Sequence, residues 1–220
     1  MTLGQTRTAA IPTIKRLPLY PRSLRDLQVQ GEAFASSAAL AKELMLDPIV
    51  VRKDLAITGV VGTPRRGFPV DALILAIMEF LGWSNTTDAF LCGVGSLGRA
   101  LLGYEGFQLY GLRIVAAFDA NPDKIGTKEH GVKIFDVRKM PTMIERMHIQ
   151  LGILTVPADA AQSAANTMIA AGIRGIWNFT PVKLEVPDTV VIQRVDLASS
   201  LAVLSHRLAA QAAGCPLPPG

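Results

Sequence analysis

Cysteine and histidine are scarce in this sequence of 220 residues, which has two cysteines and three histidines. Cys92 and Cys215 are far apart, and neither a CxxC motif nor a cysteine–histidine cluster accompanies them. The sequence therefore predicts no disulfide and no metal site. Cys92 ends a short apolar run, and we interpret it as a small buried side chain rather than as a redox-active thiol.

Long apolar runs are also missing. No segment reaches the roughly 20 apolar residues that a membrane-spanning helix needs, and the N-terminal segment MTLGQTRTAA lacks the apolar core of a signal peptide. We therefore expect a cytoplasmic protein without a membrane partner. The net charge of +4 is too small to indicate a nucleic-acid partner by itself, so the positions of the charges matter more than their sum.

The most informative segment covers residues 88–119. A short apolar run at residues 89–92 is typical of a buried strand and leads into a GxGxxG motif. The first glycine of such a motif allows a tight turn, the second lets a pyrophosphate approach the backbone, and the third lets helix and strand pack closely. The candidate cofactor-binding residues of this loop are Gly93, Val94, Gly95, Ser96, Leu97 and Gly98.

A second apolar run, at residues 112–118, ends on Asp119. An acid at this distance from the glycines accepts hydrogen bonds from the adenosine ribose hydroxyls and repels a 2′-phosphate. The expected cofactor is therefore NAD(H) rather than NADP(H). A glycine turn in some other α/β sheet is the alternative interpretation.

Strand and helix patterns alternate through the second half of the chain. Apolar runs at residues 132–135, 151–156, 175–178 and 189–195 predict strands, and residues 140–147 and 158–171 predict helices. This βαβα order predicts a doubly wound parallel sheet of the Rossmann type. Ligands of such sheets bind at the carboxyl ends of the strands, which adds these candidate cofactor-binding residues: Thr155, Val156, Pro157 and Asn178.

The N-terminal part carries a pattern of two short helices joined by a tight turn. Ser36 or Ser37 caps a helix at residues 38–45. Asp47, followed by a proline, caps a second helix at residues 48–57. Two helices so close together are consistent with a helix-turn-helix.

The second of these helices directs Arg52 and Lys53 outward, and its apolar residues can face the core: Ile49, Val50, Val51 and Leu55. Adjacent cations on the second helix of such a pair are typical of a DNA reader. The GTPRRGFP segment that follows predicts a β-hairpin wing with Arg65 and Arg66 at its tip, where they suit phosphates or the minor groove. The alternative is a small three-helix domain with a solvated basic face.

These patterns divide the chain into three parts. We expect a DNA-binding domain at residues 1–84, which ends with a helix at residues 72–81 capped by Asp71. A cofactor-binding domain follows at residues 85–196. The remaining residues, 197–220, contain a helix with Leu201, Leu204 and Leu208 at spacings of three and four, an apolar stripe that needs a partner.

Taken together, the motifs resemble the Rex family of redox-sensing transcriptional repressors. The resemblance rests on VRKDL in the second helix, the GxGxxG motif, FDANPDKIG, and WNFTPVKL followed by VDLASSL. It covers nearly the whole chain, from about Ile14 to Leu208. Each motif alone is common, but their order and spacing are specific to that family.

The resemblance implies a winged helix that binds operator DNA, a Rossmann domain that binds NAD(H), and a homodimer with a swapped C-terminal helix. It assigns DNA contacts to Ser37, Arg52, Lys53, Arg65 and Arg66. It also implies that Tyr104 lies near the nicotinamide, and that Asp196 pairs with Arg22 in the DNA-competent state and with Tyr104 when NADH is bound. The protein is then expected to be a repressor that NADH releases from DNA, and not an enzyme.

The sequence departs from the family pattern in three places. Leu197 stands where the family often has an aromatic residue, and the wing reads GTPRRGF instead of a sequence closer to KRGVGY. Pro18 and Pro21 interrupt the first helix of the family, so this helix is expected to start near Pro21.

Two other function classes fit parts of the sequence. An NAD-dependent dehydrogenase needs a proton donor beside the nicotinamide, but none of the three histidines, His130, His148 and His206, follows a strand on the cofactor side. A nucleotide-binding module without DNA contact is the other alternative. DNA binding with and without NADH would separate these classes.

Overall fold

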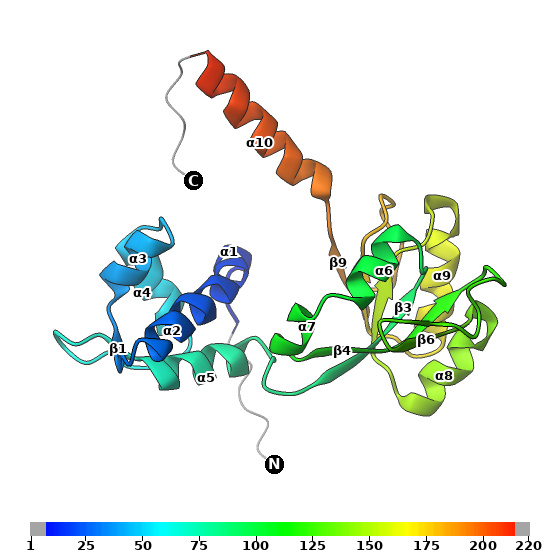
Figure 1. Cartoon of the computed structure of the whole chain (residues 1–220), viewed down its shortest axis with the longest axis horizontal. Helices are drawn as coiled ribbons and strands as arrows, with labels where there is room; N and C mark the ends of the chain where they lie inside the picture. Colours follow the sequence, from blue (N-terminus) through cyan, green and yellow to red (C-terminus); the bar gives the residue numbers. More distant parts are fainter. Residues whose placement is uncertain (1–7, 214–220) are drawn as a thin grey trace. The chain divides into compact units, whose positions relative to one another are not determined.

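The computed structural model describes residues 8–213, which form two compact units (Figure 1). The chain passes from the first unit to the second between Asn85 and Thr86. Each unit has a hydrophobic core of its own. Cys215 and the rest of the C-terminal tail lie outside the described residues.

The first unit consists of short helices and a two-stranded sheet (Figure 1). The helices are α1 (Ile11–Arg16), the 3-10 helix η1 (Leu17–Leu19), α2 (Tyr20–Val29), α3 (Ser37–Glu43), α4 (Pro48–Ala56) and α5 (Val70–Phe80). Strand β1 (Phe34–Ala35) pairs antiparallel with β2 (Phe68–Pro69), and a bridge between Thr63 and Gly67 closes the wing turn before β2. The predicted helix-turn-helix is therefore α3 and α4, and the wing follows it.

Side chains cap both helices of this pair, as the sequence predicted. The Ser36 hydroxyl accepts a hydrogen bond from the Ala39 N–H at 3.0 Å, which makes Ser36 rather than Ser37 the N-cap of α3. The Asp47 carboxylate accepts one from the Ile49 N–H at 2.6 Å and caps α4. Each cap satisfies a backbone donor that the helix itself leaves unpaired.

Two other predictions for this unit are wrong. Helix α5 begins at Val70, so Asp71 lies in its first turn and accepts a hydrogen bond from Gln28 instead of capping the helix. Ile49 is 55% exposed, whereas Val51 and Leu55 are fully buried. Because the nine residues of α4 carry apolar side chains on more than one side, the sequence alone does not determine which side faces the core.

Both Pro18 and Pro21 lie at positions where a missing backbone N–H costs little. Pro18 is part of η1, and Pro21 lies in the first turn of α2. The core beneath these helices combines side chains from η1, α2, α3, α4 and α5: Leu17, Tyr20, Leu24, Leu40, Val51, Leu55, Leu73 and Ile77.

A seven-stranded sheet forms the centre of the second unit (Figure 1). In spatial order its strands are β5 (Lys128–Glu129), β6 (Val132–Asp136), β4 (Leu112–Asp119), β3 (Thr87–Cys92), β7 (Leu151–Leu154), β8 (Gly175–Asn178) and β9 (Val191–Arg194). Neighbouring strands are parallel except for β5, which is antiparallel to β6. Without β5, this is the 3-2-1-4-5-6 order of dinucleotide-binding sheets, and it reverses between β3 and β7.

Helices cover both faces of this sheet. On one face, α8 (Met140–Met147) and α9 (Ala158–Ala170) contribute Ile144 and Ala165 to the core around Phe90. On the other face, α6 (Ser96–Leu102) contributes Leu101 to a second core around Leu91. The short helices α7 (Gly106–Leu109) and η2 (Val137–Lys139) follow α6 and β6. The predicted doubly wound parallel sheet is therefore confirmed.

The last helix, α10 (Leu197–Ala212), follows β9. The described residues of its own unit leave its apolar stripe uncovered, because Leu201, Leu204 and Leu208 are each more than half exposed. None of the described helices is long and apolar enough to cross a membrane.

Candidate cofactor site and nucleic-acid interface

The glycine-rich loop connects the end of β3 to the start of α6. Gly93 adopts a left-handed φ of +100°, and a Cβ there would lie 2.7 Å from the Thr155 carbonyl. A Cβ on Gly98 would lie 2.1 Å from the Gly93 carbonyl oxygen, whereas a Cβ on Gly95 would meet nothing within 4 Å. Gly93 and Gly98 are thus required by the fold itself, and Gly95 leaves open space above the loop.

Thr155, at the end of the neighbouring strand β7, fixes this loop. Its hydroxyl donates a hydrogen bond to the Gly93 carbonyl at 2.7 Å, and its N–H donates to the Cys92 carbonyl at 2.9 Å. The loop therefore lies where the strand order reverses, the position at which doubly wound sheets bind their ligands. Helix α6 begins directly after it, at Ser96.

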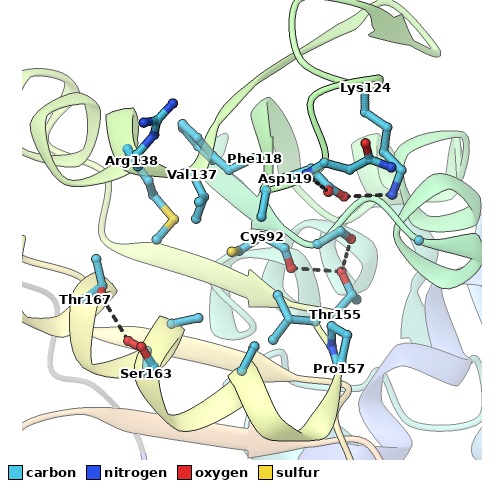
Figure 2. Close-up of a pocket in the computed structure, with 18 of the residues that line it drawn as sticks. Cys92, Phe118, Asp119, Lys124, Val137, Arg138, Thr155, Pro157, Ser163 and Thr167 are labelled. Carbon is cyan, nitrogen blue, oxygen red and sulfur yellow. Dashed lines mark hydrogen bonds and ion pairs between the residues drawn. The ribbon is translucent and has the colours of Figure 1, made fainter.

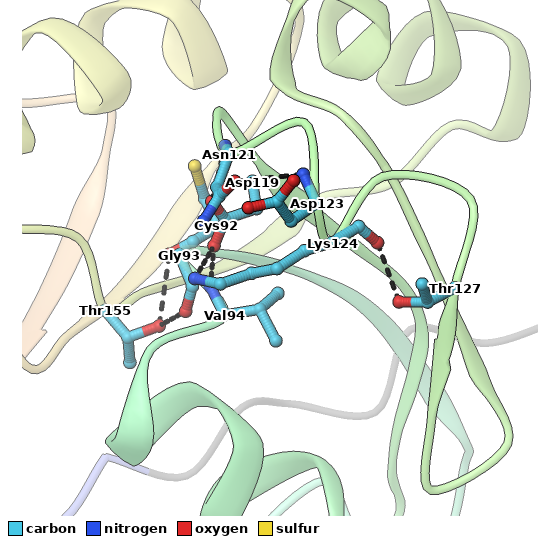
Figure 3. Close-up of polar contacts among 9 residues, drawn as sticks. All are labelled: Cys92, Gly93, Val94, Asp119, Asn121, Asp123, Lys124, Thr127 and Thr155. Atoms are coloured by element: carbon cyan, nitrogen blue, oxygen red, sulfur yellow. Dashed lines mark hydrogen bonds and ion pairs between the residues drawn. The ribbon is translucent and has the colours of Figure 1, made fainter.

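The carboxylate of Asp119, at the end of β4, is held by three donors (Figure 3). One oxygen accepts the Val94 N–H at 2.8 Å and the Lys124 ammonium at 3.0 Å, and the other accepts the Asn121 N–H at 2.8 Å. Partial burial raises the pKa of Asp119, but the hydrogen bonds from Asn121, Lys124 and Val94 outweigh it and leave this pKa below its ordinary value. Asp119 is therefore ionised and also holds the loop in place.

An open cavity of about 910 Å³ lies at this edge of the sheet (Figure 2). Its walls include six of the residues predicted to bind cofactor: Gly93, Gly95, Asp119, Thr155, Val156 and Pro157. Ser163 and Thr167 of α9 line the side of the cavity that lies across from Asp119 and Lys124 (Figure 2). A cavity of this size is within the usual range for small-molecule and cofactor sites.

Cys92 lines the same cavity but has little reactivity. Its side chain is almost fully buried, and burial together with the charge of Asp119 raises the pKa of the thiol to about 12. The thiol therefore stays protonated at neutral pH, and the thiolate is the reactive form. Burial agrees with the interpretation of Cys92 as a small apolar side chain.

The other candidate cofactor residues do not line this cavity. Val94 is buried in the loop and Gly98 is buried in α6. Ser96 and Leu97 are exposed on the first turn of α6, and Asn178 is buried at the end of β8. The amide of Asn178 donates to the Val182 carbonyl, and its oxygen accepts hydrogen bonds from Thr180. Asn178 thus shapes the turn that follows β8.

Tyr104 lies beyond the end of α6 and is 53% exposed. Its ring packs edge-on against Phe107 at 4.8 Å, and Phe107 in turn lies 5.6 Å from Trp177 of β8. A Cβ on Gly106 would lie 2.5 Å from the Tyr104 ring, so this glycine makes room for the tyrosine.

The other two switch candidates lie in different units. Asp196 is the N-cap of α10, where its carboxylate accepts the Ala198 N–H at 3.1 Å and the Ser199 hydroxyl at 2.8 Å. Arg22 is exposed on α2 of the first unit. Among the described residues, no hydrogen bond joins Asp196 to Tyr104. The capping role of Asp196 was not expected from the sequence, and a substitution of Asp196 alters the cap as well as the charge.

The candidate DNA contacts all lie in the first unit. Arg52 and Lys53 are exposed on α4, and Ser37 is the first residue of α3. Arg65 is exposed at the wing turn in a left-handed conformation with φ +63°. Arg66 lies beside it, with its guanidinium 4.0 Å from the centre of the Phe34 ring, so a cation–π contact holds this arginine against β1.

Several residues of the site were not expected from the sequence. Lys124 and Asn121 hold Asp119, and Val137 and Arg138 extend the cavity beyond it. Lys124 stands in the motif FDANPDKIG, but the spacing did not indicate a contact with the acid. Among the described residues, no group of three or more histidine, cysteine or acidic side chains is placed to hold a metal ion.

Comparison with known proteins identifies the family. A family model described as "CoA binding domain" matches residues 84–182, and one described as "Putative DNA-binding protein N-terminus" matches residues 10–56. The redox-sensing transcriptional repressor Rex of Treponema denticola is 45% identical over 92% of this chain and 96% of its own length. The chain belongs to the Rex family. The Rex of Bacteroides fragilis is 43% identical over 90% of each chain.

Solved structures of Rex-family repressors have the same fold. The crystal structure of RSP in complex with β-NAD+ and operator DNA matches with a TM-score of 0.86 and 34% identity, covering 93% of this chain and 94% of RSP. RSP in complex with β-NADH matches with a TM-score of 0.83 and 33% identity, covering 96% of this chain and 97% of RSP. Both the winged helix and the Rossmann sheet are thus those of a Rex-family protein.

Proposed function

We propose that this chain is a redox-sensing transcriptional repressor that binds operator DNA as a homodimer and leaves it when NADH binds. The observation that carries the proposal is the presence, on one chain, of a helix-turn-helix with exposed cations and of a glycine-rich loop at a large cavity. The relatives and the complexes of RSP with NAD+, NADH and operator DNA support it. As a repressor it would act in the cytoplasm, where its operator lies.

The cofactor we assign to the cavity is NAD(H). Backbone N–H groups at the start of α6 suit its pyrophosphate, and the ionised Asp119 suits the ribose hydroxyls. Val156 and Pro157, in the turn that follows β7, are then assigned to the nicotinamide half, with Asn178 and Tyr104 as further candidates. We assign no catalytic role to any residue of the chain.

DNA recognition is assigned to α4 and the wing, through Arg52, Lys53, Arg65 and Arg66, with Ser37 at the start of α3. Arg52→Ala should lower affinity for operator DNA while leaving NADH affinity and the oligomeric state unchanged, because an arginine that reads guanine is worth about 1–3 kcal/mol of discrimination. Arg146→Ala, which removes an exposed arginine of the second unit, is the matched control. Unchanged operator binding by Arg52→Ala would show that α4 does not read DNA.

Dimerisation is assigned to α10, whose apolar stripe is left exposed by the described residues of the second unit. A stripe of this kind is stable in water when another surface buries it. Removal of residues 197–220 should therefore give a monomer or an aggregate in sedimentation or light scattering. A well-folded dimer of the shortened chain would refute this assignment.

The switch is assigned to Asp196, Arg22 and Tyr104. We propose that Asp196 pairs with Arg22 in the DNA-bound state and with Tyr104 once NADH is bound. Because Asp196 also caps α10, Asp196→Ala would remove a cap worth about 1 kcal/mol together with the charge. Asp196→Asn keeps a capping side chain and removes the charge, so it should bind operator weakly and respond little to NADH. Release of this variant by NADH as in the wild type would show that the switch lies elsewhere.

A further inference from the structure

A buried carboxylate connects α4, the helix to which we assign DNA recognition, to the N-terminal helices α1 and α2. Asp54 lies on α4 next to the exposed Lys53, but its own side chain is only 1% exposed. It accepts hydrogen bonds from the Thr13 hydroxyl at 2.9 Å and the Tyr20 hydroxyl at 2.9 Å, and from the Arg16 guanidinium at 2.6 and 2.7 Å. Two of the donors lie on α1 and the third is the first residue of α2, so three side chains of the N-terminal helices contact a single residue of α4.

The donors are well suited to a permanent contact. Arg16 approaches both carboxylate oxygens, a two-point geometry that fixes orientation as well as distance. Burial, followed by the hydrogen bond to Asp54, raises the pKa of Tyr20, so its hydroxyl remains a donor at neutral pH. Burial also raises the pKa of Asp54, but the bonds from Arg16, Tyr20 and Thr13 outweigh this and keep it ionised.

A contribution to stability does not by itself explain why a charged side chain is buried here. Removing two charges from water costs free energy, and replacing a buried ion pair by apolar side chains is often neutral or stabilising. The neighbouring core residues Val51 and Leu55 already attach α4 to the unit by apolar contact. Apolar burial is non-directional, whereas hydrogen bonds are not satisfied once their angles are lost. The contact therefore restricts how α4 can rotate.

Rotation of α4 matters because Arg52 and Lys53 lie on its outer side. A side chain reaches about 6 Å from the axis of a helix, so a rotation of roughly 20° displaces its tip by about 2 Å. Displacement on this scale breaks a hydrogen bond to a base edge. We propose that Asp54 is a positioning residue for operator recognition, which fixes the rotation of α4 through Thr13, Arg16 and Tyr20 so that Arg52 and Lys53 meet the bases in register. This inference rests on the proposed DNA-binding function.

The test compares specific with non-specific DNA binding by full-length Asp54→Asn. The specific probe is the duplex that the wild-type protein enriches from a randomised pool, and the non-specific probe is the same duplex with its sequence scrambled. Affinities are measured by fluorescence anisotropy at several salt concentrations. Asp54→Asn should lose at least about fivefold in the ratio of the two affinities, the size of one base contact. Its scrambled-duplex affinity should change no more than the loss of one negative charge accounts for, and its NADH affinity should be unchanged.

Asp26→Asn is the matched control, because Asp26 is an exposed acid on α2 of the same unit. Loss of a negative charge alone strengthens binding to any DNA, so both variants share that effect and only Asp54→Asn should lose discrimination. Should Asp54→Asn fail to fold, Tyr20→Phe decides, since it removes one donor and keeps the buried ring. We expect Tyr20→Phe to lose about two- to fivefold in the same ratio, with its dimer intact.

Two outcomes would overturn the proposal in different ways. If the wild-type protein enriches a duplex and a folded Asp54→Asn or Tyr20→Phe variant discriminates equally well, Asp54 has only a structural role. If the wild-type protein enriches no duplex at all, the proposed function fails, and the positioning role fails with it.

Discussion

The three glycines of the cofactor loop should respond differently to the same added methyl group. A Cβ on Gly98 would lie 2.1 Å from the Gly93 carbonyl oxygen, far inside contact distance, and the obstacle is backbone that cannot turn aside. Overpacking costs about 1–3 kcal/mol, and a backbone clash this close belongs at the upper end. At about 2–4 °C per kcal/mol for a chain of this length, Gly98→Ala should lower Tm by roughly 6–12 °C.

Gly95→Ala should instead leave the stability unchanged and weaken NADH binding. Gly95 has an ordinary φ of −78°, and its Cβ would meet nothing within 4 Å. An alanine there reduces the freedom of the unfolded chain by about 0.4–1 kcal/mol, so Tm should stay level or rise slightly. Gly95 nevertheless lines the cavity, and a methyl group would occupy the space through which a pyrophosphate approaches the backbone. NADH affinity should fall at least about tenfold.

The assay pairs calorimetric unfolding with NADH titration for each variant. Gly175→Ala is the control, because Gly175 lies at the amino end of β8 and its Cβ would make only ordinary contacts, at 3.5 Å or more. It should leave both Tm and NADH affinity close to wild type. A stable Gly98→Ala variant, or a Gly95→Ala variant that binds NADH as the wild type does, would refute this division between fold and ligand.

Asp119→Ala should weaken NADH binding at least about tenfold and reduce the preference for NADH over NADPH, because a hydrogen bond to a charged group is worth about 1.5–3 kcal/mol. As a control, Asp88→Asn, in an exposed ion pair at the start of β3, should change neither the NADH affinity nor this preference. Equal affinity of the wild type for NADH and NADPH would show that Asp119 does not select between them. Because the pKa of Asp119 is depressed, its contribution should persist as pH falls from 8 to about 5 and be lost only below the ordinary carboxyl range. Cys92, with a pKa of about 12, should react with iodoacetamide at pH 8 at least about 100-fold more slowly in the folded protein than in urea, measured in a Cys215→Ser variant; comparable rates would contradict its burial.

Local sequence patterns predicted most of the fold. The strands, the glycine-rich loop and the caps at Ser36 and Asp47 each depend on a few neighbouring residues, whose conformational preferences act over one turn. The rotation of α4 could not be read in this way. Its apolar residues are distributed around the helix, and the buried contact of Asp54 that accompanies the observed rotation comes from residues 34–41 positions earlier in the chain.

The candidate site was predictable in its types of residue but not in its contacts. Asp119 was expected to face a ribose, yet its carboxylate is also the acceptor for the Val94 N–H and the Lys124 ammonium. Likewise, Arg66 was expected at the wing tip, and the structure places it in the wing turn, but its contact with the Phe34 ring was not expected. Contacts of this kind depend on how the chain folds back on itself, so no local pattern encodes them.

In the proposed repressor, NADH and operator DNA bind to opposing states of one protein. If NADH changes the affinity for DNA by some factor, DNA must change the affinity for NADH by the same factor. The most direct measurement titrates NADH into the complex with the enriched duplex at fixed NAD+, and then measures NADH affinity with and without that duplex. We expect NADH to release the DNA, and we expect bound DNA to lower the affinity for NADH by the same factor by which NADH lowers the affinity for DNA. Operator binding that is indifferent to NADH at saturation would contradict the proposal.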